Sequence, residues 1–155
     1  MNPHNRLRFR PANSNDIATL ADFNCRLAME TEGKTLDAAI VRSGVTRGLN
    51  VGDEVQYFVA EAEGNIVGQI MLTREWSDWR DGWMAWLQSV YVVADFRGQG
   101  IFRGLLNHAK QQLRSQPDVV CLRLYVEQEN ETAIATYRRL DFEDPGYRVL
   151  EMPLR

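Results

Sequence analysis

The sequence is poor in the residues that cross-link small folds or bind metals. It has only two cysteines and two histidines among 155 residues. Cys25 and Cys121 both fall in apolar segments, so we expect two buried free thiols in a reducing compartment rather than a disulfide. His4 lies near the N-terminus and His108 on the side of a helix that we expect to be exposed, and neither is spaced for metal ligation. The sequence therefore predicts no metal site.

Positive charge is not in excess, and long apolar runs are missing. The 18 Lys and Arg against 21 Asp and Glu give a net charge of −3, which argues against nucleic acid as a partner because that partner requires a clustered basic face. No apolar segment reaches the roughly 20 residues that cross a membrane, and residues 1–6 lack the apolar stretch of a signal peptide. We therefore expect a cytoplasmic protein with no nucleic-acid and no membrane partner.

The composition is that of an ordinary globular protein. With 45% hydrophobic and 25% charged residues in 155, the chain is expected to fold as a single domain over residues 1–155. It is long enough to bury a core without disulfides or metals.

Hydrophobic periodicity and turn residues predict the order β-α-α-β-β-β-α-β-α-β. Strands are expected at 7–10, 55–61, 66–74, 83–93, 119–126 and 148–154, and helices at about 14–29, 36–47, 99–115 and 130–140. Asn13 or Ser14 is the expected N-cap of the first helix, and Thr35 that of the second. This order predicts an α+β (α/β layered) fold with a mixed, partly antiparallel sheet and helices on both faces. The nearly apolar run 83–93 and the strand 119–126 are expected to be parallel, joined by a right-handed helical crossover.

A glycine turn between that apolar run and the third helix is the first motif with chemical content. Residues 97–102 read Arg-Gly-Gln-Gly-Ile-Phe. Backbone N–H groups at a helix start are unpaired and bind anions, and glycines let the backbone approach a ligand. The turn lacks the dinucleotide fingerprint, because Arg103 stands where the third glycine is required. It therefore predicts a phosphate site of another kind.

A second motif follows the last buried strand. Residues 130–142 contain Asn130-x-x-Ala133-Ile134-x-x-Tyr137 and end in Asp141-Phe142. At this spacing the two motifs, which cover roughly the C-terminal half, resemble the GNAT superfamily of acyl-CoA-dependent N-acetyltransferases. The glycine turn is similar to that family's signature for the coenzyme A pyrophosphate, and the second motif to the segment whose tyrosine faces the thioester sulfur. The chain departs from the family at Phe102 and Asp141, where small residues are usual.

The resemblance implies acetyl-CoA as the co-substrate and a set of residues that bind it. The fourth strand of the family separates from the fifth, which here places the open edge at residues 90–93. The backbone N–H of Val92 is the candidate donor to the developing oxyanion, and Tyr137 the candidate general acid for the leaving thiolate. The implied cofactor-binding residues are Val90, Val92, Val93, Arg97, Gly98, Gln99, Gly100, Ile101, Phe102, Arg103, Asn130 and Ala133.

Simpler interpretations stand beside these roles. Tyr137 has the helical spacing of a core residue, and Asn130 is a good helix N-cap whatever else it binds. Four tryptophans cluster around the loop into the apolar run, where they either pack at the rim of the core or form an aromatic wall beside the acceptor. They are Trp76, Trp79, Trp83 and Trp86.

The general base and the acceptor site are less well marked. Trp86 and Gln88 occupy positions at which members of the family often carry Glu or His, and neither side chain is a base. Glu127 is the sequence alternative, and a chain of waters to bulk solvent is equally open. Glu30 ends the first helix, where an acid opposes the helix dipole, and is therefore a candidate to bind a cationic amine.

The resemblance thus implies an N-acetyltransferase that transfers an acetyl group from acetyl-CoA to a primary amine of a small molecule or protein, by direct attack in a ternary complex. A non-catalytic acyl-CoA-binding or regulatory module on the same fold is the alternative, and a transferase for another acyl group is a third interpretation. The acceptor amine is unidentified, and a homodimer is left open.

Overall fold

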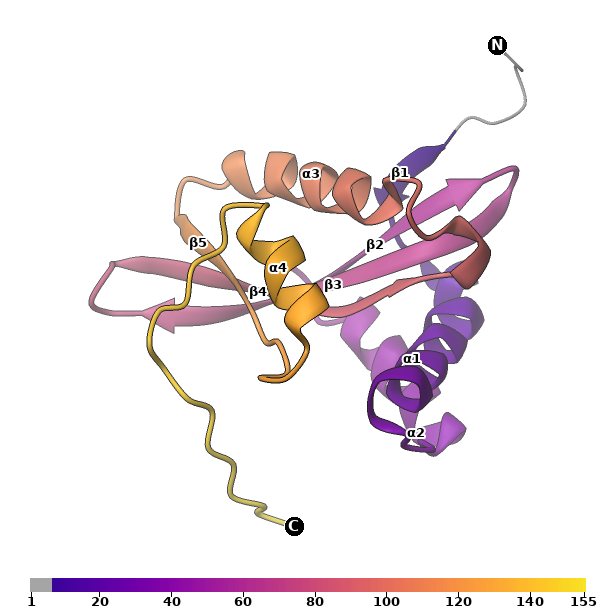
Figure 1. The fold of residues 1–155 in the computed structure, drawn as a ribbon, viewed down its shortest axis with the longest axis horizontal. Helices are drawn as coiled ribbons and strands as arrows, with labels where there is room; N and C mark the ends of the chain where they lie inside the picture. The colour runs from indigo at the N-terminus through magenta and orange to yellow at the C-terminus, as the bar shows by residue number, and fades with distance from the viewer. Residues whose placement is uncertain (1–6) are drawn as a thin grey trace. The chain divides into compact units, whose positions relative to one another are not determined.

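The computed structural model describes residues 7–155 (Figure 1). The chain divides after Leu124 into two compact units, and the second unit is Tyr125–Arg155. The expectation of a single domain over residues 1–155 stays a prediction. The first unit contains β1 (Arg8–Pro11), α1 (Ile17–Glu32), α2 (Ala38–Leu49), β2 (Val55–Ala62), β3 (Asn65–Ser77), β4 (Gly82–Val92), α3 (Ile101–Arg114) and β5 (Val119–Leu124), and the second contains α4 (Glu131–Arg138).

The five strands form one mixed sheet in the order β1-β2-β3-β4-β5. The first three pairings are antiparallel, and β4 and β5 are parallel, so the predicted mixed sheet and parallel crossover pair are confirmed. The β4 sequence is nearly apolar because β3 and β5 flank it and helices lie over the sheet.

Helices cover both faces of this sheet, as predicted (Figure 1). Side chains alternate along β2, so Tyr57 and Val59 face one side and Phe58 faces the other. Tyr57 and Val59 form a buried core with Leu20 of α1 and Val45 of α2. Phe58 stacks edge-on against His108 of α3, with ring centroids 5.4 Å apart. His108 thus lies against the sheet, and its predicted exposed position is wrong.

Two glycines allow α3 to lie close to the sheet. A Cβ on Gly104 would lie 2.0 Å from Cζ of Phe9, and one on Gly68 would lie 3.0 Å from Cγ2 of Ile101. Gly68 of β3 therefore fixes the N-terminal turn of α3 against the sheet. This contact holds residues 97–100, which precede α3, beside the end of β4.

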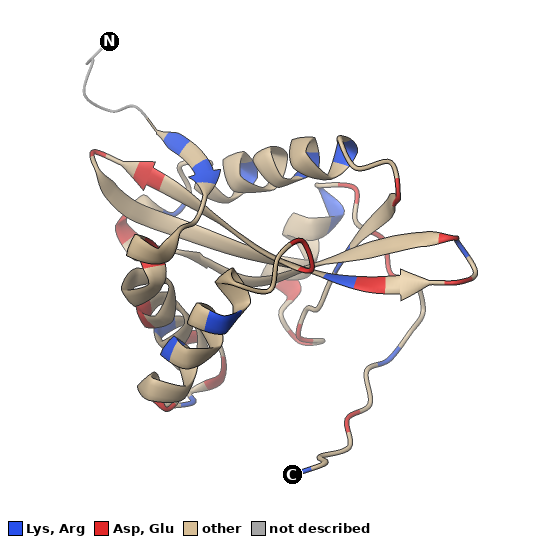
Figure 2. Ribbon diagram, turned by 180° about the vertical axis from the view of Figure 1, so that it is seen from behind, with Lys and Arg blue, Asp and Glu red and all other residues tan. Residues whose placement is uncertain are grey.

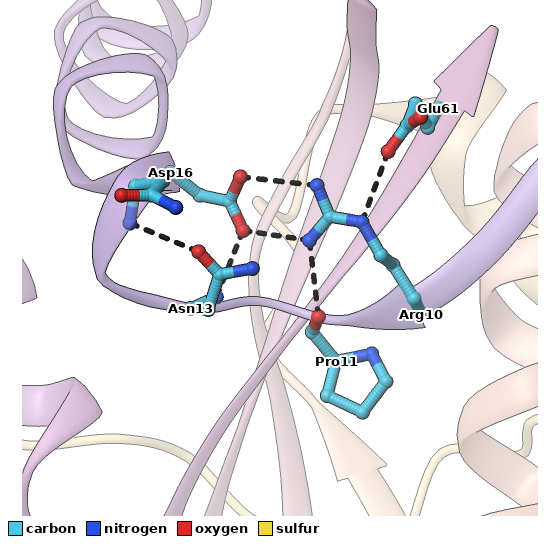
Figure 3. A network of polar contacts seen from close by, with 6 residues as sticks. Arg10, Pro11, Asn13, Asp16 and Glu61 are labelled. Carbon is cyan, nitrogen blue, oxygen red and sulfur yellow. Dashed lines mark hydrogen bonds and ion pairs between the residues drawn. The ribbon is translucent and has the colours of Figure 1, made fainter. Parts of the chain in front are cut away.

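A charged network anchors the start of α1 on β1 and β2 (Figure 3). Arg10 donates to Asp16 at 2.7 and 3.1 Å and to Glu61 at 3.0 Å. Asp16, only 4% exposed, also accepts from the N–H of Asn13 at 2.8 Å. Burial alone would raise the pKa of Asp16, but the hydrogen bonds from Arg10 and Asn13 and the charge of Arg10 hold it below its ordinary value. Asn13 was one of the two residues predicted to cap the first helix. Its side chain accepts from the N–H of Asn15 and caps the 3-10 turn that leads into α1, so this prediction is confirmed.

Two sequence predictions about secondary structure are wrong, namely the cap of the second helix and the last strand. The carboxylate of Asp37 accepts from the N–H groups of Ala39 and Ile40, so Asp37 rather than Thr35 caps α2, and the helix begins later than expected. Residues 148–154 form no strand. A strand requires a partner for its backbone groups, and the structure shows no strand within residues 125–155 that could pair with this segment. Pro153 also lacks the N–H that a strand would donate.

Charges of both signs share the same parts of the first unit. Figure 2 shows acidic and basic residues together on α1 and at the hairpin between β3 and β4. None of the helices in residues 7–155 is long and apolar enough to cross a membrane. Within the same residues, no three His, Cys, Asp or Glu side chains gather as metal ligands would.

Candidate functional site

The edge of β4 that faces β5 is paired over only part of its length. The last pair that β5 makes with β4 joins Leu124 to Leu87. On its other side, β4 pairs with β3 as far as Val92. Residues 88–92 therefore lie beyond the last β5 pair, with an edge that an extended ligand can join through main-chain hydrogen bonds.

A β-bulge marks the beginning of this open edge. Tyr91 pairs with Gln69, but Gln88 pairs with Met71, so β4 has one extra residue between the two pairs. Ser89 sits in the bulge with φ of +51°, a left-handed conformation that is unusual for a residue with a side chain.

Beyond the bulge, the backbone of Val92 points to the open edge. The N–H of Val93 donates to the carbonyl of Val67 in β3 at 2.9 Å. In an antiparallel pair, successive residues alternate between facing the partner strand and facing away from it. The N–H and C=O of Val92 therefore face away from β3, and the C=O accepts from Nε of Arg97 at 2.8 Å.

The glycine turn leads into a helix start that no side chain of the described residues caps. Gly98 and Gly100 have φ of +76° and +79°, and a Cβ on either would meet no atom within 4 Å. They are therefore needed for their left-handed backbone, and the space beside them is open. The first hydrogen bond of α3 runs from the N–H of Gly104 to the C=O of Gly100 at 2.9 Å. The N–H groups of residues 101–103 thus have no intrahelical acceptor and can bind an anion.

The side chains in this first turn differ in exposure. Ile101 is buried, Phe102 is half-buried and Arg103 is exposed. Gln99 donates from Nε2 to the carbonyl of Asp95 at 2.8 Å, which steadies the turn from within.

Glu30 and Arg97 are brought together, although they were predicted for different ligands. A terminal nitrogen of Arg97 lies 2.6 Å from a carboxylate oxygen of Glu30, whose other oxygen accepts from the Tyr91 hydroxyl at 3.1 Å. The guanidinium also lies over the Tyr91 ring, 5.4 Å from its centroid. The hydrogen bond from Arg97 is the main reason that the pKa of Glu30 lies below its ordinary value. Glu30 is therefore an ionised carboxylate at neutral pH.

Glu30 also lies at a hollow formed by the end of α1 and the segment that follows it. The hollow has a volume of about 360 Å³ and is lined by Cys25, Arg26, Met29, Glu30, Thr35 and Leu36. The lining thus combines apolar side chains with one carboxylate, from Glu30, and one guanidinium, from Arg26.

Trp86 and Gln88 lie on the sheet face that α1 and α2 cover. Gln88 lies opposite Met71, which packs on the α1–α2 core. Its Nε2 donates to Oγ1 of Thr73 at 2.6 Å. Nε1 of Trp86 donates to a Glu75 carboxylate oxygen at 3.0 Å. Both side chains are thus bonded to β3, whereas Glu30 is bonded to Arg97 and Tyr91.

The four tryptophans do not form one aromatic wall. Trp83 and Trp86 are three residues apart in one strand and therefore face opposite sides of the sheet. Trp83 stacks edge-on with Trp76, with ring centroids 5.1 Å apart. Trp79 lies in the turn between β3 and β4 and is 91% exposed.

In the second unit, the predicted N-cap of α4 is confirmed, and the helix ends at Arg138, before the predicted Leu140. The side-chain oxygen of Asn130 accepts from the N–H of Ala133 at 3.1 Å, so Asn130 is the helix N-cap. Asp141 follows the helix with φ of +66°, the left-handed conformation expected there.

Tyr137 and Glu127 lie in this unit as well. Tyr137 stacks edge-on with Phe142, with ring centroids 5.8 Å apart. Burial raises the pKa of the Tyr137 phenol above its ordinary value of 10.0, so the group is protonated at neutral pH. Glu127 is exposed, and its carboxylate accepts from the N–H of Glu129 at 2.8 Å.

The polar contact that holds the bulge was not predicted from the sequence. Gln69 of β3 is fully buried and donates to the Ser89 carbonyl at 3.2 Å and to Asn24 of α1 at 2.8 Å. A signal was present, because Gln69 interrupts an apolar strand and Asn24 lies on the buried side of an amphipathic helix. Two polar residues at buried positions predict a partner for each.

Comparison with known proteins gives a family for most of the chain. Residues 25–142 match the acetyltransferase (GNAT) family. A curated relative, an uncharacterised N-acetyltransferase of Methanocaldococcus jannaschii, is 34% identical over 93 residues, which are 59% of this chain and 41% of that protein. The chain therefore spans less than half the length of this relative.

Solved structures give similar matches. A possible acetyltransferase from Clostridium difficile 630 is 41% identical, with a TM-score of 0.89 over 96% of this chain and 98% of that one. A predicted acetyltransferase from Clostridium acetobutylicum, solved with acetyl-CoA, is 17% identical, with a TM-score of 0.78 over 96% of this chain and 97% of that one. At 17% identity, the similarity to the second structure shows only that the fold is shared.

Proposed function

Because the chain belongs to the acetyltransferase (GNAT) family, we propose that it transfers an acetyl group from acetyl-CoA to a primary amine of a small molecule or protein. Acetyl transfer is what the family has in common, whereas the amine acceptor and direct attack in a ternary complex are the proposal. One observation carries it: the open edge of β4, at residues 88–92, leads within a few residues to the uncapped start of α3. A strand edge followed by an anion site suits a ligand with an amide-bearing arm and a pyrophosphate.

The open edge and the turn divide the binding of acetyl-CoA between them. Backbone groups of Val90 and Val92 hydrogen-bond the amides of the pantetheine arm, as an added strand would. The N–H of Val93, which the sequence also assigned to the cofactor, is instead bonded to the carbonyl of Val67 in β3. N–H groups of residues 98–103 bind the pyrophosphate, where the left-handed glycines leave open space and the helix dipole is positive. Arg97 and the exposed Arg103 add positive charge beside that site. In the second unit, Asn130 and Ala133 at the start of α4 complete the proposed set.

The residues of the chain stabilise charge as the acetyl group moves. The neutral amine attacks the thioester carbon, so a C–N bond forms while the C–S bond breaks. The N–H of Val92 donates to the carbonyl oxygen as it gains negative charge. The Tyr137 phenol gives its proton to the sulfur, and its raised pKa means that this proton is present at neutral pH.

The amine's own proton leaves by a separate route, through Glu127 or through water to bulk solvent. Glu30 suits another role, because Arg97 keeps its carboxylate ionised and therefore a poor proton acceptor. As one of the residues that line the hollow beside α1, it attracts the cationic form of the acceptor before deprotonation.

Calorimetric titration with acetyl-CoA and with CoA tests the binding part of the proposal. Thiol release from acetyl-CoA in the presence of spermidine, kanamycin and a lysine-containing peptide tests transfer. We expect binding of both ligands and amine-dependent thiol release with at least one class of amine. Absence of binding at millimolar ligand contradicts the proposal. Binding without release across a broad amine library favours the alternative, a non-catalytic acyl-CoA-binding module. Cytoplasmic location and a homodimer stay predictions.

A further inference from the structure

Gln69 is a polar residue at a fully buried position of β3, with 0% of its surface exposed. Its Nε2 lies 2.8 Å from Oδ1 of Asn24 and 3.2 Å from the carbonyl oxygen of Ser89. A backbone carbonyl can only accept a hydrogen bond, so the nitrogen of the Gln69 amide, rather than its oxygen, must face Ser89. Both hydrogens of Nε2 are thus used, one toward α1 and one toward the bulge of β4.

The other atom of this amide indicates that packing alone does not explain Gln69. Its Oε1 is buried and has no hydrogen-bond partner among the described residues. A buried polar atom without a partner is destabilising, whereas a methionine or leucine would fill the same space without that loss. What distinguishes glutamine at this position is the pair of hydrogen bonds from Nε2.

The contact with Ser89 sets the direction of the next N–H group. No peptide bond in the described residues is cis, so the C=O of Ser89 and the N–H of Val90 point in opposite directions from one peptide plane. Because the carbonyl is held toward the Gln69 side chain, the N–H of Val90 is directed away from that side chain. Two residues later, the N–H of Val92 faces away from β3, so the fixed peptide leads directly to the donor at the open edge.

The backbone does not hold this direction by itself. Ser89 has φ of +51°, which residues with a Cβ adopt reluctantly, so the bulge relaxes to another backbone conformation once the Gln69 contact is removed. A relaxed bulge turns the 89–90 peptide and displaces the strand that leads to Val92.

We propose that Gln69 is a positioning residue for acetyl transfer, which holds the Ser89–Val90 peptide and thereby the strand segment that presents the Val92 N–H to the thioester oxygen. The inference rests on the proposed function. Gln69 touches neither substrate in this account and acts through the backbone of the bulge.

The test compares Gln69→Met, which keeps the volume and removes both donors, with Asn24→Ala, which removes the other Nε2 partner and leaves the Ser89 contact. Gln69→Leu serves as a second variant should methionine prevent folding. We expect kcat of Gln69→Met to fall about 10- to 100-fold, approaching the loss that follows removal of an oxyanion donor. The affinity for CoA, which has no thioester oxygen, should change by less than about threefold. Asn24→Ala should keep kcat within about threefold of the unsubstituted protein.

A crystal structure of Gln69→Met supplies the readout that needs no activity. A rotated 89–90 peptide supports the proposal, and a peptide unchanged from that of the unsubstituted protein overturns it. An equal loss of CoA affinity and kcat also overturns it, because that pattern indicates general damage to the site. If the unsubstituted protein transfers no acetyl group, the proposed function fails, and the orientation of this peptide still decides whether Gln69 holds the bulge.

Discussion

The two halves of β4 have the same neighbour on one side and differ on the other. Over residues 83–87, both edges are paired, and the preceding Gly82 packs so closely on β5 that a Cβ there would lie 2.5 Å from Cγ1 of Val120. Over residues 88–92, β3 still pairs with one edge, and the other lies beyond the last β5 pair. Strand pairing holds the first half, whereas side chains hold the second: Gln69 bonds to Ser89, and Arg97 bonds to Val92. A strand edge can therefore be left open for a ligand and still be fixed in direction.

The largest expected effect comes from Tyr137→Phe. This substitution tests whether the open half of β4 binds the cofactor while Tyr137, in the second unit, supplies the proton to the leaving thiolate. Losing the phenol proton should lower kcat about 100-fold, because general acids contribute effects of that size. The affinity for CoA should be unchanged, as calorimetry can check.

The pH dependence of the unsubstituted protein sharpens this prediction. Burial raises the pKa of Tyr137, so the phenol keeps its proton to higher pH than a free tyrosine with a pKa of 10.0. The rate should therefore show no decline from loss of this proton below about pH 10. A rate of Tyr137→Phe equal to that of the unsubstituted protein would remove the general-acid role.

Gly82→Ala should break the paired half of β4. The added Cβ would lie 2.8 Å from the backbone oxygen of Asp118 as well as against Val120, so β5 must shift. We expect a loss of about 2 kcal/mol in the free energy of unfolding, measured in urea. Gly44→Ala, in α2 with no atom within 4 Å of the new Cβ, is the matched control and should stabilise by up to about 1 kcal/mol. Equal stability of the two variants contradicts the close packing at Gly82.

The sequence predicted the paired half of β4 better than the open half. Apolar periodicity located the strands, and the helix after the glycine turn indicated a parallel crossover partner, which β5 is. Asn13 was a readable cap because its side chain bonds to backbone within two residues. Such features are local, and local spacing is what a sequence displays.

The features that shape the open half join distant residues. Nothing about Ser89 marks it as left-handed, and its partner Gln69 is 20 residues away along the chain. The pairing of Glu30 with Arg97 spans 67 residues and needs the sheet to bring α1 to the end of β4. The separation of β4 from β5 was expected only through the family resemblance, because neither strand contains a residue that would end the pairing between them.

Gly100→Ala should weaken the anion site beside the open half without breaking the fold. With φ of +79° and open space around it, the position accepts a Cβ at the expense of about 1 kcal/mol of backbone strain. Relief of that strain would redirect the N–H groups of residues 101–103. We expect CoA affinity to fall about tenfold, and calorimetry will measure it. Gly33→Ala, also left-handed and also free of close atoms, controls for strain alone and should leave CoA affinity unchanged.

Glu30→Gln has the smallest expected effect. Both partners of the ion pair are about half exposed, so its loss should change stability by less than about 1 kcal/mol. Arg97 would then be released toward the pyrophosphate, and CoA affinity should rise about threefold. The KM of a cationic acceptor should rise, because the carboxylate at the hollow is lost. Unchanged CoA affinity together with unchanged KM would show that the pair has no part in ligand binding.

The central claim is that acetyl-CoA binds along the open half of β4 and the turn that follows it. Titration of the ¹⁵N-labelled protein with acetyl-CoA, followed through backbone amide shifts, tests it residue by residue. We predict the largest shifts at Val90, Val92, Gly98 and Gly100, with small shifts at Trp83 and Ala85 in the paired half. Shifts that are uniform along β4, or that are largest in its paired half, would contradict the account.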